Sequence, residues 1–340
     1  MTQRIILAGG GHAHLAVLAD WASKPLPQTE RWLVTSSRFT AYSGMLPGWM
    51  AGIYHADDLL IDLAPLAQRA GATLVLAEVT ALDADNRLLT LANGAAMGFD
   101  FLSLAIGGEA QLSHLAALGA AVLPVKPVNS FMQKWSTMES RVSASISRQI
   151  VVVGGGAAGV ELALGAEFAL RNGAPGSRVA LVVQPGGLLP GHVEAVRKQA
   201  IDELVRRQIP VHFAQAAGVE GGLLLSDGSF LLADCVIAAT GSRAPGWLAQ
   251  SGLACTAQGF VAVGADMRSI SHPRILAAGD IVDRADRSLP RSGVHAVKAG
   301  PVLAANLRVL LGGGAMRNYQ PGGRSCRGGQ LPLPVGWRGG

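Results

Sequence analysis

The stretch that decides the fold is VVVGGGAAGVELA, which occupies residues 151–163 near the middle of the 340-residue chain. A run of β-branched valines stops at glycine, and an apolar helical pattern follows. Gly154, Gly156 and Gly159 have the spacing G-x-G-x-x-G, which permits a tight turn, a close approach of backbone to a pyrophosphate, and close packing of helix on strand. The following helix offers its free N–H groups to phosphate oxygens. The stretch therefore predicts a dinucleotide-binding βαβ unit.

A second glycine loop of the same kind begins near the amino terminus. Residues 5–7 are a short apolar strand, Gly9 and Gly11 take the first two fingerprint positions, and His14 takes the third. We expect His12 to lie beside the pyrophosphate through its backbone and His14 to be a packing residue rather than a catalytic base. Two dinucleotide cradles in one chain indicate that electrons pass from one cofactor to the other.

The second strand of each predicted unit ends without the acidic residue that usually binds a ribose. The strand at residues 32–35 is followed by Ser36 and Arg38, which can bond a ribose hydroxyl and approach phosphate or adenine. This weakens a nicotinamide assignment for the first site and fits a flavin dinucleotide. The strand at residues 179–183 ends at Gln184, whose neutral amide leaves the choice between NADH and NADPH open.

A third signal is the apolar stretch at residues 275–278, which is followed by Gly279 and Asp280. A simple turn is the alternative, but behind two fingerprints the carboxylate is expected to accept a hydrogen bond from a ribityl hydroxyl. The helix that follows, through residue 311, can stabilise negative charge on a reduced flavin ring with its amino end. Residues 234–241 echo residues 101–107, which predicts a structural repeat closing both dinucleotide units.

Composition narrows the class of protein. The net charge of +5 comes without a basic stripe interleaved with aromatics, so a nucleic-acid role is not expected. The three cysteines show no C-x-x-C or other metal spacing, which predicts reduced thiols and no metal site. We expect no signal peptide and no transmembrane segment, and hence a cytoplasmic protein, with weak peripheral contact at the inner membrane face as an alternative.

The remaining pattern predicts several connecting elements. The glycine- and aromatic-rich residues 39–54 are not periodic and form either a linker or a loop along the flavin ring. Asp57 or Asp58 is the expected N-cap of the next helix. The other expected elements are helices at residues 59–70, 130–145 and 194–208 and a hairpin at residues 222–232.

Taken in order, four motifs resemble the pyridine nucleotide-disulfide oxidoreductase superfamily over residues 4–311; they are GGG at 9–11, GGGAAGVE at 154–161, ATG at 239–241 and AGD at 278–280. The resemblance implies an α/β protein with two Rossmann-like dinucleotide-binding domains of the glutathione reductase-like type, the FAD domain interrupted by the NAD(P) domain. The implied parts are an FAD-binding domain at residues 1–108 and 242–318, an NAD(P)H-binding domain at 109–241, and a poorly ordered tail at 319–340.

The branch of the superfamily follows from what is missing. No cysteine precedes Cys235, so the flavin-proximal cysteine pair of disulfide reductases is absent, and the cysteines do not match sulfide:quinone reductases. The chain most resembles type II NADH dehydrogenases. More narrowly, GGGHAH at residues 9–14 with YSGMLPG at 42–48 resembles the flavoprotein module associated with selenide, water dikinase.

The implied function is an FAD-dependent NAD(P)H dehydrogenase that passes electrons to a quinone or another small acceptor. The alternatives are a redox flavoprotein of selenium or sulfur metabolism and a non-catalytic flavin-binding protein. A homodimer is a further expectation. Because the tail lacks the carboxy-terminal elements of type II dehydrogenases, quinone as the acceptor stays open.

Together the motifs and the resemblance define the expected site residues. The FAD contacts are Gly9, Gly11, His12, Ala13, Ser36, Arg38, Ser43, Gly107, Gly279, Asp280, Ala296 and Val297. The NAD(P)H contacts are Gly154, Gly156, Ala157, Gly159, Gln184 and Gly241. Glu161 either positions the nicotinamide carboxamide or is only a carboxylate at a helix start. Lys126 and His295 are catalytic candidates near the flavin ring, or else a surface lysine and a helix-start histidine.

Overall fold

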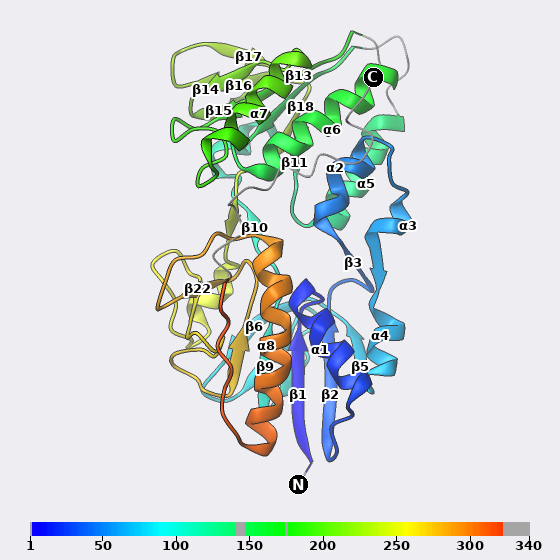
Figure 1. Cartoon of the computed structure of the whole chain (residues 1–340), viewed down its shortest axis with the longest axis vertical. Coiled ribbons are helices and arrows are strands. Elements are labelled where there is room, and N and C mark those ends of the chain that lie inside the picture. The colour runs from blue at the N-terminus through cyan, green and yellow to red at the C-terminus, as the bar shows by residue number, and fades with distance from the viewer. Residues whose placement is uncertain (1, 141–146, 174–175, 322–340) are drawn as a thin grey trace. The chain divides into compact units, whose positions relative to one another are not determined.

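The structure, a computed structural model, describes residues 2–140, 147–173 and 176–321, and these form two compact units (Figure 1). The first unit comprises Met1–Tyr42, Leu60–Glu109 and Ser242–Pro321. The second comprises Ser43–Leu59 and Ala110–Gly241. Each unit is built around its own five-stranded sheet.

The sheet of the first unit has the strand order β21-β9-β1-β2-β5, and every pair in it is parallel. Its strands are β1 (Gln3–Ala8), β2 (Thr29–Thr35), β5 (Thr73–Leu76), β9 (Phe101–Leu104) and β21 (Ile275–Ala277). The last four residues of β1 are fully buried, because a parallel sheet is covered on both faces and its central strands are continuously apolar.

Helices α1 (His12–Ser23) and α8 (Gly293–Gly312) pack side by side in the first unit (Figure 1). The contact requires glycine at position 300, since a Cβ there would lie 2.7 Å from the Cβ of Ala16 and 2.8 Å from the carbonyl oxygen of Ala13. Among the described residues, α8 is the one helix long and apolar enough to cross a bilayer. Its residues Leu303 and Leu307 are buried in the apolar core of the first unit.

The helix α4 (Leu63–Arg69) begins later than the sequence pattern predicts. Asp62 is its N-cap, and the Asp62 carboxylate accepts a hydrogen bond of 3.0 Å from the Ala64 N–H. The prediction of Asp57 or Asp58 as the cap was wrong. Those two residues lie in the separate short helix α3 (Ala56–Leu59), and the strand β4 (Leu60–Asp62) interrupts the predicted helix by pairing with β3 (Phe39–Ala41).

Smaller sheets complete the first unit. They are the antiparallel set β6 (Val79–Asp83), β7 (Leu88–Leu91) and β8 (Ala96–Gly98), and the parallel pair β20 (Val261–Val263) and β22 (Val282–Arg284), with the 3₁₀ helix η3 (Gly246–Gln250). Short strands β10 (Glu109–Ala110) and β19 (Ser242–Arg243) pair with each other.

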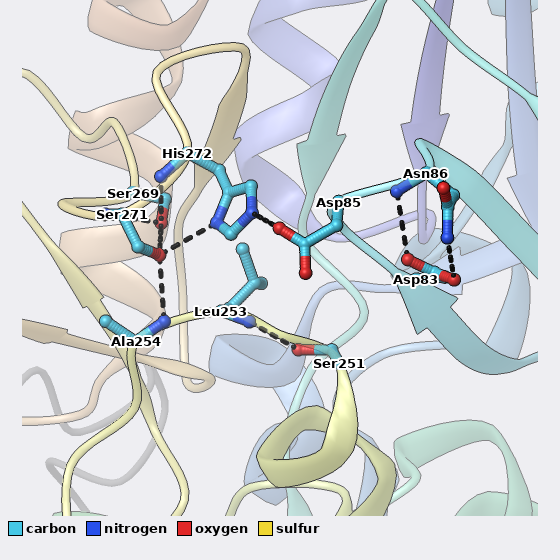
Figure 2. A network of polar contacts seen from close by, with 9 residues as sticks. All are labelled: Asp83, Asp85, Asn86, Ser251, Leu253, Ala254, Ser269, Ser271 and His272. Atoms are coloured by element: carbon cyan, nitrogen blue, oxygen red, sulfur yellow. Dashed lines mark hydrogen bonds and ion pairs between the residues drawn. The ribbon is translucent and has the colours of Figure 1, made fainter.

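A polar network ties the turn after β6 to the loop before β21 (Figure 2). His272 lies 3.1 Å from the Asp85 carboxylate through Nε2 and 2.9 Å from the Ser271 hydroxyl through Nδ1. The Ser271 hydroxyl in turn accepts a hydrogen bond from the Ala254 N–H. The network fixes loops at the edge of the first unit, and its residues are not among the expected site residues.

The sheet of the second unit has the order β11-β18-β12-β13-β14 and is also parallel throughout. Its strands are β11 (Val122–Pro124), β12 (Gln149–Val153), β13 (Arg178–Val183), β14 (Val211–Phe213) and β18 (Cys235–Ala238). The 3₁₀ helix η2 (Ser113–Ala121) and an antiparallel set, β15 (Ala216–Val219), β16 (Gly222–Leu225) and β17 (Phe230–Leu232), complete the unit.

The predicted helices of the second unit are present with small shifts at their ends. They are α5 (Val128–Ser140), α6 (Ala157–Gly173) and α7 (Glu194–Arg206). The end of the first predicted helix, at residues 141–145, lies outside the described residues. The predicted hairpin is confirmed: the Gly228 N–H donates to the Leu225 carbonyl at 2.9 Å, and Gly228 has φ +85°.

The sequence predicts a linker or a loop along the flavin ring at residues 39–54. Within and after this stretch, residues 43–59 form η1 (Ser43–Met45), α2 (Leu46–Met50) and α3. They pack within the second unit, although the sequence pattern counts them with the first. The contact is made by α2 on α6, where a Cβ at Gly165 would lie 2.8 Å from the Pro47 carbonyl oxygen. The glycine in the middle of α6 therefore makes room for this segment.

The predicted repeat is present in the strand order. In the first unit β9 pairs with β1, and in the second β18 pairs with β12 in the same position. The residue after each of the strands β9 and β18 donates its N–H to the end of the glycine-loop strand, Ala105 to Ala8 at 2.8 Å and Ala239 to Val153 at 2.9 Å. The two units therefore share one βαβ construction.

The two units differ at the third position of the glycine fingerprint. In the second, a Cβ at Gly159 would lie 1.9 Å from the Gly154 carbonyl oxygen, so only glycine fits. In the first, the side chain of His14 is buried, with Nδ1 2.7 Å from the Gly9 carbonyl oxygen and Nε2 2.9 Å from the Ser103 hydroxyl. His14 is a packing residue, as expected, and hydrogen bonds take the place of the close helix–strand contact.

Burial lowers the pKa of His14 from the ordinary 6.5 to about 4, so this ring is neutral in the folded protein at neutral pH. His14→Ala leaves two buried polar groups without a partner and should lower the free energy of unfolding by about 2–4 kcal/mol. As pH falls from 6.5 to 4, His14 takes up a proton in the unfolded chain before it does so in the folded protein. The free energy of unfolding of the wild type should therefore fall by roughly 3 kcal/mol over this range, whereas that of the variant should not show this loss. Urea unfolding at several pH values measures both effects. Ser103→Ala is the control and should retain the pH dependence; equal pH dependence in wild type and His14→Ala would contradict this assignment.

Candidate functional site

The first glycine loop folds over the end of the neighbouring strand β9. The Gly11 N–H donates to the Ala105 carbonyl at 3.1 Å. A Cβ at Gly9 or Gly11 would lie 2.3 or 2.4 Å from that same oxygen, and Gly9 has φ +97°. Both glycines are therefore required by the protein's own packing, and the loop holds the start of α1 at the carboxyl end of β1.

The start of α1 can receive an anion. Gly11 is the N-cap, it has no side chain to cap the helix, and the first turn carries no acidic residue. The first N–H groups of a helix have no partner within the helix and lie at the positive end of its dipole. His12 and Ala13 occupy this turn, as expected for residues beside a pyrophosphate.

The expected acidic residue lies at the same end of the first unit. Gly279 follows β21 with φ +84°, and a Cβ on it would lie 3.7 Å from that of Ala296 in the first turn of α8. One Asp280 carboxylate oxygen lies 3.4 Å from the Ser242 hydroxyl, and the Asp280 charge acts on His12. The structure thus brings the first glycine loop, Asp280 and the start of α8 together within one unit.

A small cavity of about 30 Å³ lies at the first turn of α8, lined in part by Gly279, Ser292, His295 and Tyr319. Nδ1 of His295 lies 2.7 Å from the Tyr319 hydroxyl, so one ring nitrogen is engaged by the segment that follows α8. Burial, and secondly the charge of Lys298, lower the pKa of His295. The ring is therefore neutral at neutral pH and next to the residues expected to hold a flavin.

Tyr319 is itself held firmly, contrary to the expectation of a poorly ordered tail from residue 319. It is buried, its N–H donates to the Ala265 carbonyl at 2.8 Å, and its carbonyl accepts from the Arg284 guanidinium at 2.6 Å. The Arg284 side chain is 2% exposed and also bonds the Asp286 carboxylate. Residues 322–340 of the expected tail lie outside the described residues.

For the other expected FAD residues, the structure shows fewer contacts with the first glycine loop. Arg38 donates two hydrogen bonds of 2.9 and 2.7 Å to the Asp62 carboxylate, so its guanidinium already has an acidic partner. Ser36 is exposed at the end of β2, and Gly107 has φ +74° beyond β9. Val297 is exposed on α8, whereas Ser43 lies in the second unit.

The second glycine loop repeats the first with one informative difference. Gly154 has φ +141°, and a Cβ on it would lie 2.2 Å from the Ala239 carbonyl oxygen. At Gly156, by contrast, a Cβ would meet nothing within 4 Å. Because packing does not demand glycine there, the open space fits a ligand that approaches the backbone. Ala157 begins α6 at this point.

Gln184 and Gly241 lie at the carboxyl ends of β13 and β18 in the second unit, which is where a dinucleotide binds a parallel sheet. Both are exposed, and Gly241 has φ +90°. Lys126 follows β11 in the same unit. Gln184 and Gly241 are residues that the sequence predicts for the second site.

Glu161 is the most perturbed carboxyl group of the second unit. It lies one turn into α6, and burial raises its pKa from 4.5 to about 7. A carboxyl that is half protonated near neutral pH can either donate or accept a hydrogen bond. Such a group beside a ligand cradle is typical of a functional site.

Sequence reasoning missed His192, which lies in the loop after β13. Its Nδ1 is buried without a hydrogen-bond partner among the described residues. The loop contacts the second fingerprint, because the Leu189 N–H donates to the Gly155 carbonyl at 2.7 Å. A lone histidine in the stretch GGLLPGH carries no pattern that could have indicated this.

The cysteines that the structure describes are far from reactive. Burial raises the pKa of the Cys235 thiol to about 12 and also raises that of Cys255. Cys326 lies outside the described residues. Among residues 2–140, 147–173 and 176–321, no group of three or more histidine, cysteine or acidic side chains is placed to hold a metal.

Comparison with known proteins places this geometry in a family. The family model described as pyridine nucleotide-disulphide oxidoreductase matches residues 3–300. An NADH dehydrogenase-like protein of Mycobacterium tuberculosis is 32% identical over 233 residues, which are 65% of this chain and 58% of the relative. The chain thus spans less than two thirds of the length of that relative.

Two solved structures show the same fold. The ferredoxin reductase of Rhodopseudomonas palustris has a TM-score of 0.78 at 20% identity and covers 94% of this chain and 78% of its own. The water-forming NADH oxidase of Lactobacillus brevis, solved with NADH bound, has a TM-score of 0.76 at 18% identity, covering 90% and 69%. At these identities the likeness concerns the fold.

Two neighbouring glycines should respond differently to the same change. Gly156→Ala should lower the free energy of unfolding by less than about 1 kcal/mol, because its Cβ enters open space, yet it should weaken NADH binding roughly tenfold. Gly159→Ala should lower stability by about 3 kcal/mol or more, because its Cβ would overlap the Gly154 carbonyl. Urea unfolding and titration with NADH separate the two. Unchanged NADH affinity in Gly156→Ala would show that nothing binds at that backbone.

Proposed function

Because the chain belongs to the pyridine nucleotide-disulphide oxidoreductase family, we propose that it is an FAD-dependent enzyme that takes hydride from NAD(P)H and passes the electrons to a small acceptor. The observation that carries the proposal is the pair of glycine cradles, one in each compact unit and built on the same strand order. One dinucleotide donates and the other accepts, which is why such an enzyme needs two cradles.

The first cradle fits FAD. Its second strand ends without a ribose-binding carboxylate, and the Asp280 carboxylate, 3.4 Å from the Ser242 hydroxyl, lies near the loop, where it would accept a hydrogen bond from a ribityl hydroxyl. The amino end of α8, with Ser292 as N-cap, adds a positive dipole end beside Gly279. When bound, FAD would supply the hydride-accepting chemistry, and these residues bind and orient it.

The second cradle fits NAD(P)H. Gly156 leaves room for the pyrophosphate, and Gln184 lies where a ribose hydroxyl is expected. In this assignment Glu161 positions the carboxamide of the nicotinamide, either by donating to its oxygen as a neutral acid or by accepting from its N–H as a carboxylate. His295, in the first unit, is retained as a candidate beside the flavin, and Lys126, in the second unit, is retained as a catalytic candidate.

The proposed electron acceptor depends on the cysteine chemistry of the described residues. A disulfide acceptor on the chain itself would need a reactive cysteine pair, and the two cysteines that the structure describes, Cys235 and Cys255, have raised pKa values. We therefore favour direct transfer of the electrons to a small diffusible oxidant, a quinone being one candidate. The match covers only 58% of the length of the mycobacterial relative. The identity of the electron acceptor is therefore part of the proposal.

Anaerobic mixing of the FAD-loaded protein with NADH, and separately with NADPH, tests the function. The visible absorbance of the flavin should bleach with at least one of them and return when a quinone is added. If the absorbance returns only when a selenium or sulfur compound is added, the enzyme would instead be a redox flavoprotein of selenium or sulfur metabolism. A flavin that stays oxidised with both nucleotides would reduce the protein to a flavin binder.

Glu161→Gln should raise the free energy of unfolding above neutral pH and should slow reduction of the flavin by NADH. The folded protein retains the Glu161 proton up to about pH 7, whereas the unfolded chain ionises near 4.5. The native state is therefore penalised increasingly as pH rises through this window. The variant should be more stable than wild type by roughly 2 kcal/mol at pH 8, allowing for partial exposure, and nearly equal at pH 4.5.

The same variant should reduce its flavin more slowly with NADH and should lose any step in that rate near pH 7. Urea unfolding and anaerobic stopped-flow measurements provide the two readouts. Glu167→Gln, on the same helix but paired with Arg207, serves as the control for the flavin reduction rate. A Glu161→Gln protein that gains stability yet keeps the wild-type rate would leave Glu161 without a role in the reaction.

A further inference from the structure

The His12 ring occupies a specific place in the first cradle. It belongs to the first turn of α1, directly after the two glycines of the loop. Its ring meets that of Tyr42 edge-on, with centroids 5.5 Å apart and planes at 68°. The half-buried ring therefore has an aromatic packing contact on one side.

One nitrogen of this ring lacks a partner. Nε2 of His12 is buried, and no hydrogen-bond partner for it exists among the described residues. Buried polar atoms in folded proteins are nearly always hydrogen-bonded, to protein, water or ligand. The contrast with His14, two residues along, is direct: both of its nitrogens bond protein atoms.

Two other unpartnered buried nitrogens of the first unit do not share this setting. Those of Trp21 and Trp32 belong to the core of the first unit and its edge. His12 combines an unpartnered nitrogen with a helix amino end that can receive an anion and with an acidic residue expected to hold a ribityl chain. That combination points to the ligand as the missing partner.

A neutral His12 ring can present Nε2 as a hydrogen-bond donor. Burial lowers the pKa of the ring, and Asp280 opposes this by favouring the protonated form. The lowered pKa favours the neutral ring, which carries one N–H on either nitrogen. Phosphate oxygens only accept hydrogen bonds, so the tautomer with the proton on Nε2 is the one that suits a bound dinucleotide.

We propose that the His12 side chain is an FAD ligand, donating a hydrogen bond from Nε2 to an oxygen where the pyrophosphate meets the ribityl chain. The proposal rests on the assignment of FAD to the first cradle. It goes beyond the expected backbone contact, because it makes the side chain at this position part of the site.

Binding of FAD to the apoprotein, followed by quenching of flavin fluorescence, tests the proposal. His12→Phe keeps an aromatic ring against Tyr42 and removes the donor, so the dissociation constant should rise roughly tenfold. His12→Gln retains an N–H donor and should recover most of the affinity. His55→Phe makes the same chemical change at an exposed histidine in the second unit and should leave FAD binding unchanged.

Phosphorus NMR of bound FAD provides a readout independent of turnover. His12→Phe should shift a pyrophosphate resonance, and His12→Gln should shift it less. Unchanged affinity and unchanged resonances in His12→Phe would mean that a water molecule satisfies Nε2 and would overturn the proposal. If His12→Phe does not fold, the comparison of His12→Gln with His12→Ala decides in the same way.

The two proposals fail differently. A wild-type protein that binds no FAD would remove the proposed function together with this inference. A wild-type protein that binds FAD and is bleached by NADH, but whose His12 variants bind FAD equally well, would remove the inference alone.

Discussion

The contact on which the rest of this structure depends is that of a glycine backbone against a carbonyl oxygen at the end of the neighbouring strand. Gly9 meets the Ala105 carbonyl, and Gly154 meets that of Ala239. Any side chain would lift the loop off the sheet edge. With glycine, the loop turns sharply and points the next helix's amino end over the carboxyl ends of the strands, where phosphates bind.

The two units solve one further problem differently. In the second, glycine at the third position lets α6 approach its own loop. In the first, the buried His14 side chain occupies that position and bonds Gly9 and Ser103, and α1 packs closely on α8 at Gly300. This packing holds α1 and α8 together within the first unit. The departure from the sequence motif at His14 therefore corresponds to a different packing arrangement in the first unit.

Much of this arrangement is predictable from local pattern. The strand–glycine–helix order, the repeat and the packing role of His14 all follow from residues close together in sequence. The features that were missed depend on distant partners. Asp62 caps α4 beside a pairing of β3 with β4, residues 43–59 pack on α6 at Gly165, and Tyr319 is buried by contacts with residues that precede it by 24 or more positions. Such partners leave no periodic signal.

The anchoring of Tyr319 has a consequence for how the cofactor would enter and leave. Arg284 is buried and shares its hydrogens between the Tyr319 carbonyl and Asp286, while the Tyr319 hydroxyl meets His295 at the first turn of α8. Releasing any one of these leaves a buried charge or a polar atom unsatisfied, so they are expected to open together. Opening of this corner, next to the residues proposed to hold the flavin, would then proceed through cooperative local unfolding and not through loosening of a single loop.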